Sequence, residues 1–278
     1  MWPAALDSAP VRELLTGVPP AHPRSLRFFG LPESEIAATL REAGAARDLS
    51  AVEVTTCLRR SELEVDLRPR PGADDVAEAL HAELAQRHAR HLVSADGTTT
   101  DELVAQALLD RGWTVATGES CTGGMLASRL VDRAGSSAYV AGGVVAYSND
   151  AKTNLLGVPA EMIAAHGAVS PQVARALADG ARDRFGADVG IGITGVAGPG
   201  GGTEAKPVGY VCFCVTTADG QVIARELAAG GGPTSANVDG RGMHLLLRAA
   251  RGLRAGPVRR GRRRTGRRRG PVDDVPPP

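Results

Sequence analysis

The segment ATGESCTGG, residues 116–124, is the first place where this sequence could support chemistry, because it runs from an apolar strand through a turn into a helix. Such a turn collects backbone N–H donors and the positive end of the helix dipole. Ser120 lies at this turn, so its hydroxyl could act as a nucleophile beside an oxyanion hole formed by the N–H groups of the turn. Simpler interpretations stay open: Ser120 or Thr122 caps the helix, and Glu119 is an ordinary acid of the turn.

Cys121 is the rival nucleophile at the same turn. No sequence feature distinguishes a reactive thiol here from a small buried side chain, so both interpretations stay open. The backbone N–H groups of residues 121–124 are the donors that we expect to hold the oxyanion.

Lysine is rare in this chain, since only Lys152 and Lys206 stand among 32 basic residues. Lys152 follows an apolar strand in YSNDAKTNLLGV, residues 147–158. Arginine cannot lose its proton in a protein, whereas burial can lower the lysine pKa of about 10.4 until the amine serves as a general base. This pattern suggests a Ser-Lys dyad with Ser120, in which Tyr147 orients or polarises the lysine. A solvated surface lysine is the alternative.

A glycine-rich loop, ITGVAGPGGGTEAKPVGYV at residues 193–211, is the third candidate for chemistry. Such a loop exposes backbone N–H groups and can closely approach a phosphate or a carboxylate. Thr194, Thr203 and Lys206 add polar donors. Because a strand follows the loop, it is neither a phosphate loop nor a dinucleotide fingerprint. We predict a binding loop here, with a flexible hairpin as the alternative.

No metal site is expected. His81, His88 and His91 share part of a predicted helical face, but no carboxylate has the spacing of a further metal ligand. The four Cys show no paired framework, which favours a reducing cytosol. The chain shows no secretion signal and no run of 18 apolar residues. We therefore expect no metal, no cofactor, no membrane partner and a cytoplasmic location.

The net charge of +1 conceals an uneven distribution, because residues 251–278 carry ten Arg and two Asp and the preceding body is acidic. Two Trp, three Tyr and four Phe are too few aromatic residues for a base-stacking surface. We therefore do not expect nucleic-acid binding, except for nonspecific binding through the Arg-rich tail.

Hydrophobic patterning predicts the elements that must position these candidates. Strands and helices alternate after residue 113, and the apolar runs 187–194 and 207–217 predict strands covered on both faces. Ser170 and Pro171 predict the start of a helix and Gly186 its end. We predict an α/β fold, with a three-layer α/β/α domain that has a mixed sheet and follows a small α+β module. The predicted parts are an extended segment at 1–25, the module at 26–95, the α/β domain at 100–254 and a disordered Arg-rich tail at 255–278.

Four blocks, GESCTGGMLASRL, GSSAYVAGGVVAYSNDAKTNLLGV, HGAVSPQVARALADGAR and GITGVAGPGGGTEAKPVGYV, together resemble one family in order and spacing. That family is the C-terminal domain of the competence-damage-inducible protein CinA, which includes nicotinamide mononucleotide (NMN) amidohydrolases. The resemblance implies hydrolysis of the carboxamide of NMN to nicotinate mononucleotide and ammonia, without metal. The upstream module resembles the linking region of full-length members, whose molybdopterin-binding-like N-terminal domain we expect to be absent.

The resemblance also implies roles for individual residues. The nucleophile of the family falls on Ser120, its general base on Lys152, and its supporting hydroxyls on Tyr147 and Ser137. The implied substrate-binding residues are those of the turn and of the glycine-rich loop: Glu119, Thr122, Gly123, Gly124, Thr194, Gly195, Gly202, Thr203 and Lys206. The expected partners are NMN and a second copy of the chain in a homodimer.

One departure from the family keeps an alternative function open. The family places a substrate-contacting Arg after the last strand, where this chain has Thr234, and Arg241 is a candidate to replace it. A catalytically impaired nucleotide-binding or regulatory protein is therefore the alternative to an active amidohydrolase.

Overall fold

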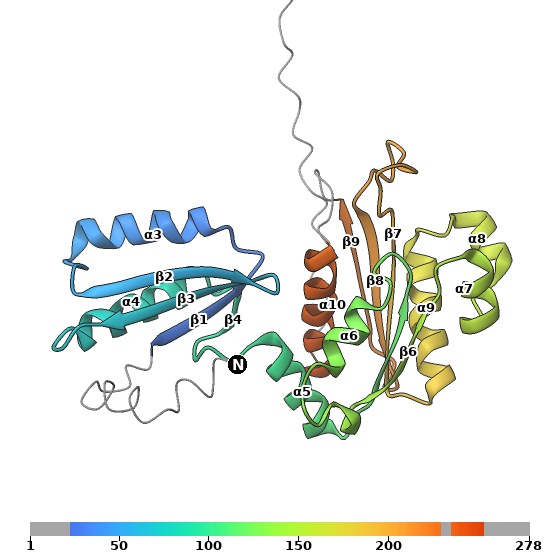
Figure 1. Ribbon diagram of the computed structural model, residues 1–278, viewed down its shortest axis with the longest axis horizontal. Helices are drawn as coiled ribbons and strands as arrows, with labels where there is room; N and C mark the ends of the chain where they lie inside the picture. The colour runs from blue at the N-terminus through green and yellow to red at the C-terminus, as the bar shows by residue number, and fades with distance from the viewer. Residues whose placement is uncertain (1–22, 229–234, 253–278) are drawn as a thin grey trace, which may run out of the picture.

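Two β-sheets, each built from a continuous stretch of chain, form the part of the protein that the computed structural model describes, residues 23–228 and 235–252 (Figure 1). The predicted Arg-rich tail, Thr234 and almost all of the predicted extended segment lie outside these residues.

The first sheet belongs to a small module of four strands and two helices. Its elements are β1 (Arg24–Phe29), α3 (Glu33–Ala46), β2 (Val52–Arg59), β3 (Glu62–Pro69), α4 (Asp74–Arg87) and β4 (Leu92–Ser94). The strands are antiparallel in the order β2-β3-β1-β4. Leu26 and Phe28 alternate with more exposed neighbours along β1, so one face of the sheet is apolar and packs against α4.

The second sheet has five strands in the order β6-β5-β7-β8-β9. Its elements are α5 (Thr100–Arg111), β5 (Val115–Glu119), α6 (Met125–Val131), the 3₁₀ helix η1 (Ser136–Ala138), β6 (Val140–Val145), α7 (Asn149–Leu156), α8 (Ala160–His166), α9 (Pro171–Phe185), β7 (Val189–Gly195), β8 (Tyr210–Thr217), β9 (Val222–Ala228) and α10 (Ser235–Ala250). Strand β5 is parallel to β6 and β7, whereas β8 is antiparallel to both of its neighbours.

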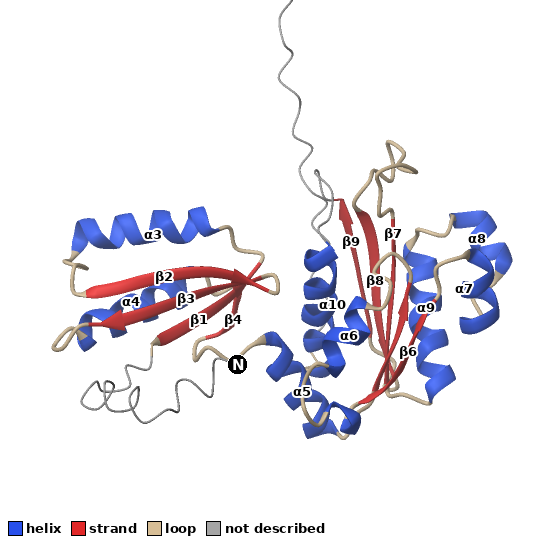
Figure 2. Cartoon of the chain, viewed as in Figure 1, coloured by secondary structure: helices blue, strands red, loops and turns tan. Residues whose placement is uncertain are grey.

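Helices cover both faces of this sheet (Figure 2). Helix α9 packs on one face, with α7 and α8 against it, while α5, α6 and α10 form a layer on the other. The predicted fold class, an α/β/α arrangement around a mixed sheet after an α+β module, is confirmed. Among the described helices, none is long and apolar enough to cross a bilayer.

The helix signals read from the sequence act as expected at α9. The Ser170 hydroxyl accepts a hydrogen bond from the Val173 N–H at 3.3 Å, Pro171 occupies the first turn, and Gly186 ends the helix in a left-handed conformation.

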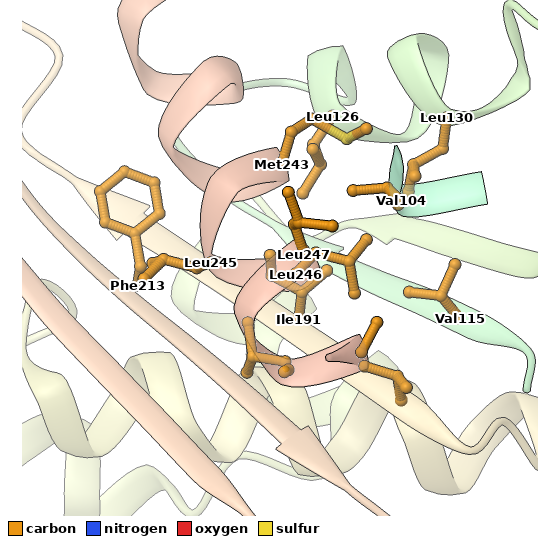
Figure 3. Close-up of a cluster of buried hydrophobic side chains, with 14 of the residues drawn as sticks. Val104, Val115, Leu126, Leu130, Ile191, Phe213, Met243, Leu245, Leu246 and Leu247 are labelled. Carbon is orange, nitrogen blue, oxygen red and sulfur yellow. The ribbon is translucent and has the colours of Figure 1, made fainter. Parts of the chain in front are cut away.

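The main hydrophobic core lies between this second sheet and the α5, α6 and α10 layer. Figure 3 shows Leu126 and Leu130 of α6 meeting Met243 and Leu247 of α10 above the sheet residue Ile191. All five side chains are buried. This core holds α6 and α10 in place behind the turn that carries Ser120.

The opposite face of the sheet depends on a close approach between β7 and α9. A Cβ atom at Gly192 would lie only 2.0 Å from the backbone oxygen of Ala174. We expect Gly192→Ala to lower the free energy of unfolding by about 1–3 kcal/mol, because the helix must move away from the strand. Urea denaturation measures the loss. Gly200→Ala is the control, since Gly200 has no heavy atom within 4 Å of the added Cβ, and equal midpoints for the two variants would contradict the argument.

A buried ion-pair cluster joins the module to the larger domain. Arg129 of α6 donates to both carboxylate oxygens of Asp101 at 2.8 and 2.7 Å and to Asp239 of α10 at 3.3 Å. Its guanidinium also donates to the backbone oxygen of Arg60 at 3.2 Å and lies 3.6 Å from the carboxylate of Glu62. Arg60 and Glu62 flank the β2–β3 turn of the module, so one side chain of α6 connects three helices to the first sheet.

Candidate active site

Ser120 lies immediately beyond the carboxyl end of β5, in a turn that leads into α6. Its backbone N–H donates to the backbone oxygen of Ile193 in β7 at 3.0 Å, and its backbone carbonyl oxygen accepts from the Gly123 N–H at 3.1 Å. Gly123 and Gly124 both have positive φ, which lets the chain reverse tightly before the helix begins. Ser120 is 6% exposed, so the hydroxyl is held at the edge of the buried sheet.

Glu119 holds the start of α6. Its carboxylate is fully buried and accepts hydrogen bonds from the N–H groups of Gly124, Leu126 and Ala127 at 2.8–3.2 Å. These are donors that a helix leaves without partners in its first turn. Glu119 therefore caps the helix. Its carboxylate positions the turn that carries Ser120, and this role requires no contact with a substrate.

The capping by Glu119 narrows the choice of oxyanion donors. The N–H groups of Gly123 and Gly124 are already occupied within the turn. No other described residue accepts a hydrogen bond from the N–H of Cys121 or Thr122. The buried Thr122 hydroxyl likewise has no hydrogen-bond partner among the described residues. Two adjacent backbone donors and one hydroxyl are thus available beside Ser120.

Lys152 enters the same region from α7 and is only 2% exposed. Its Nζ donates to the backbone oxygen of Tyr147 at 2.8 Å, and no carboxylate of the described residues forms an ion pair with it. Burial lowers the pKa of Lys152, and the thiol of Cys121 is the neighbouring group that opposes this shift. The lysine therefore lies within electrostatic reach of the turn that carries Ser120.

The Cys121 side chain packs against β7 and interacts electrostatically with Lys152. Its sulfur packs so closely on β7 that a Cβ atom at Gly195 would lie 2.9 Å from it. Burial raises the pKa of the Cys121 thiol to about 11. Because cysteine attacks as the thiolate, a thiol that stays protonated at neutral pH is a poor nucleophile.

The glycine-rich loop follows β7 and is tied to α8 and to the segment behind it. Thr194 is buried, and its hydroxyl donates to the backbone oxygen of Ala168 at 2.8 Å. Lys206 Nζ donates to the backbone oxygen of His166, the last residue of α8, at 2.9 Å. Thr203 bonds to Lys206 within the loop through its backbone N–H and its hydroxyl. The polar side chains at both ends of the loop thus have partners, while Gly200 and Gly201 between them have open space around the Cα.

Gly202 is exposed near the tip of this loop, and Gly195 lies at its start. At Gly202 an added Cβ would lie 2.7 Å from the backbone nitrogen of Val208. At Gly195 an added Cβ would lie 2.8 Å from the Val211 side chain, so neither position has room for a side chain without movement of its neighbours.

Two predicted site residues need correction. Ser137 is exposed in η1, before β6, and because β6 is parallel to β5 this position lies at the edge of the sheet opposite Ser120. Within one chain it cannot support that hydroxyl. The side chain of Tyr147 is 70% exposed, and it is the backbone oxygen of Tyr147, not its hydroxyl, that contacts Lys152.

The model of the "CinA C-terminal domain" matches residues 97–241, which include the turn, Lys152 and the glycine-rich loop. The chain belongs to the CinA family. The CinA-like protein of Mycolicibacterium gilvum is 52% identical over 255 residues, covering 91% of this chain and 60% of that relative. The CinA-like protein of Mycobacterium tuberculosis is 48% identical over 260 residues, covering 92% and 60%. The chain thus spans about 60% of the length of these curated CinA relatives.

Solved structures of CinA proteins match about half of this chain. The competence/damage inducible protein CihA from Agrobacterium tumefaciens shares 39% identity with a TM-score of 0.51, covering 55% of this chain and 95% of that one. A CinA superfamily protein from Klebsiella pneumoniae shares 37% identity with a TM-score of 0.52, covering 56% and 99%.

Three features of this CinA site were missed by the sequence analysis: the Glu119 cap, the Tyr147 carbonyl that holds Lys152, and the Arg129 cluster. The Glu119 cap could have been found from the sequence, because an acidic residue just before a helix often binds the free N–H groups of its first turn. The other two depend on contacts that no local pattern encodes.

Proposed function

We propose that this CinA chain hydrolyses the carboxamide of NMN to nicotinate mononucleotide and ammonia. The observation that carries the proposal is Lys152, a buried lysine with a lowered pKa and no carboxylate partner among the described residues, next to the turn that presents Ser120. A lysine ammonium is seldom buried without an anion, because desolvation disfavours the charged form. A neutral amine in this position is suited to act as a general base.

The proposed reaction uses the groups that surround this turn. Neutral Lys152 takes the proton of the Ser120 hydroxyl as Oγ attacks the carboxamide carbon, and the N–H groups of Cys121 and Thr122 bind the oxyanion. Lys152 then returns the proton to the departing nitrogen, which leaves as ammonia. Water, deprotonated by the same lysine, attacks the ester on Ser120, and Lys152 returns this proton to Ser120 Oγ as the carboxylate product leaves.

The glycine-rich loop would receive the nucleotide part of the substrate. Its open glycines, Gly200 and Gly201, expose backbone N–H groups that can approach a phosphate. Lys206 adds a positive charge although it is anchored to His166.

Ammonia release from NMN by the parental chain and by two neighbouring variants tests the proposal. We expect Ser120→Ala to lose at least about 10³-fold in rate, because the nucleophile is removed. Cys121→Ala keeps a rate close to the parental one, since the protonated thiol takes no part in the attack. An inactive Cys121→Ala variant together with an active Ser120→Ala variant would place the nucleophile one residue later.

A non-catalytic nucleotide-binding protein is the second candidate, and Thr234 is the observation that favours it, since the family has an arginine there. Calorimetry with NMN separates the two functions. Heat of binding without ammonia release selects the binding protein, whereas turnover selects the hydrolase.

A further inference from the structure

Strand β6 forms one border of the large sheet. Among the described residues it pairs only with β5, so one side of its backbone has no strand beside it. The N–H of Ala146, just after the strand, donates to the backbone oxygen of Glu119 in β5. Because peptide groups alternate in direction along a strand, those of Gly143 and Val145 point away from β5. Ala141, Gly143 and Val145 are exposed, so this border is open to a further strand.

The sequence of β6, VAGGVV, lacks features that usually keep a border strand from pairing. It contains no charged residue and no proline, whereas the opposite border strand, β9, carries Arg225 and Glu226. In the module, the border strand β2 carries Glu53 and Arg59, and β4 has only three residues. Charged residues, prolines and short length all protect border strands from association. Of the four border strands in the two described sheets, β6 alone has none of these three protections.

Exposed apolar side chains gather around the same border. Val145 is 49% exposed, and Tyr147, just beyond the strand, is 70% exposed. Val131, at the end of α6, is also exposed, and its backbone oxygen accepts a hydrogen bond from the Ser136 hydroxyl of η1, the segment that leads into β6. An apolar patch beside an open strand is typical of a protein–protein interface.

The strand is complementary to its own copy. In a two-fold antiparallel pair one residue faces itself at the axis, and directly opposed residues point to the same face of the sheet. With Gly143 at the axis, the two backbones meet at a position without side chains, and Gly142 of one protomer faces Val144 of its partner. The ladder between β6 and β5 has one irregularity, before Gly142, and is regular from Gly142 to Val145. The centre of the pair therefore falls in the regular part of β6, and pairing there buries no charge.

We propose that β6 binds β6 of a second copy of this chain and joins the two five-stranded sheets into one across a symmetric dimer. Backbone hydrogen bonds between the two strands and burial of the apolar side chains around them stabilise this dimer.

The pairing also places a segment of the partner at the candidate active site. Because the two strands run in opposite directions, the partner's η1, which precedes its β6, lies beside the start of α7, the helix that carries Lys152. Since β5 is parallel to β6, Ser120 lies at this same end of the sheet, two strand spacings or about 10 Å from the partner's chain. The partner's Ser137 is thereby brought to the rim of the site. This part of the inference rests on the proposed function.

Sedimentation equilibrium of the full chain measures the dimer. We expect the parental chain to dimerise, and Ala141→Lys, which puts a charge on the border of β6, to dimerise at least about 10-fold more weakly. Ala224→Lys is the matched control, because Ala224 is an exposed alanine of β9, on the opposite border of the same sheet. Urea denaturation checks that each variant is folded. A monomeric parental chain would overturn the proposal, as would equal dimerisation of Ala141→Lys and the parental chain.

Ammonia release by mixed dimers tests the role of the partner's η1. In a mixture of Ser120→Ala and Ser137→Ala chains, each mixed dimer has one site that combines an intact Ser120 with an intact Ser137 from the partner. We expect each variant alone to be impaired and the equimolar mixture to recover about a quarter of the parental rate. Absence of recovery, or a fully active Ser137→Ala variant, would remove the partner's Ser137 from the site. A parental chain that dimerises through β6 but releases no ammonia would contradict the proposed function and leave the β6 dimer in place.

Discussion

Lys152→Met is expected to abolish ammonia release from NMN while making the protein more stable. The base that accepts the Ser120 proton disappears, which lowers the rate by about 10²–10⁴-fold. The buried polar amine also disappears, and a methionine of similar shape fills its space. We expect the free energy of unfolding at pH 7 to rise by about 1–2 kcal/mol, the usual size of a gain when a strained functional group is removed. Ammonia assays and urea denaturation at pH 7 measure the two effects.

In the parental chain, the free energy of unfolding and the rate of ammonia release are both expected to depend on pH through the pKa of Lys152. Because the pKa of Lys152 is lowered in the folded state, the unfolded chain binds more protons between that pKa and the ordinary value of about 10.4. Stability contributed by this site therefore rises with pH through that window, and this rise is absent in Lys152→Met. The rate of ammonia release rises with pH through the folded pKa as the amine becomes neutral.

Lys152→Arg is the control for charge. Arginine keeps the positive charge and cannot act as a base, so this variant is inactive and is less stable than the parental chain. A Lys152→Arg variant with the parental rate would remove the lysine from the mechanism.

Arg129→Met is expected to destabilise the protein by about 3–5 kcal/mol, because it leaves three buried carboxylates without their shared cation. Those carboxylates belong to Glu62, Asp101 and Asp239. Urea denaturation at pH 7 measures the loss. Arg133→Met is the matched control on the chain just after α6, since Arg133 forms a half-exposed pair with Glu102 that contributes at most about 1 kcal/mol. Similar losses in both variants would show that the cluster has no special role.

The stability lost in Arg129→Met is expected to depend on pH. Burial acts to raise the pKa of Asp101, but the hydrogen bonds and charge of Arg129 outweigh it and lower the pKa. The parental chain therefore loses this contribution as pH falls through the lowered pKa. In Arg129→Met the buried carboxylates have lost their shared cation, so they are harder to ionise and are expected to take up protons at higher pH than they do in the parental chain. The stability difference between the two proteins is thus expected to shrink from pH 7 to pH 4.

The elements of the fold could be predicted because their signals are local. The apolar runs 187–194 and 207–217 became β7 and β8, which are buried along almost their whole length. Ser170 and Gly186 marked the limits of α9 because a hydroxyl cap and a left-handed glycine act on the adjacent turn alone.

The site was predictable only in part, for a physical reason. The turn at Ser120 and the scarcity of lysine pointed to Ser120 and Lys152 without any knowledge of the fold. Ser137 was implied only by the family resemblance, and the parallel pairing of β5 and β6 places it a whole strand length away from Ser120 within one chain. The partners of Arg129 lie up to 110 residues away in sequence, and no local pattern marks such a pairing.

Helix α6 has seven residues and a length of about 10 Å, yet it is anchored to two different parts of the molecule. Its first turn is held by Glu119, the neighbour of the candidate nucleophile, and its middle is held through Arg129 to the β2–β3 turn of the module. Helix α6 therefore joins the β2–β3 turn of the module to the donors beside Ser120 through an unbroken series of hydrogen bonds. The module contains none of the candidate catalytic residues, yet a change at its β2–β3 turn is expected to alter the position of the turn that carries Ser120.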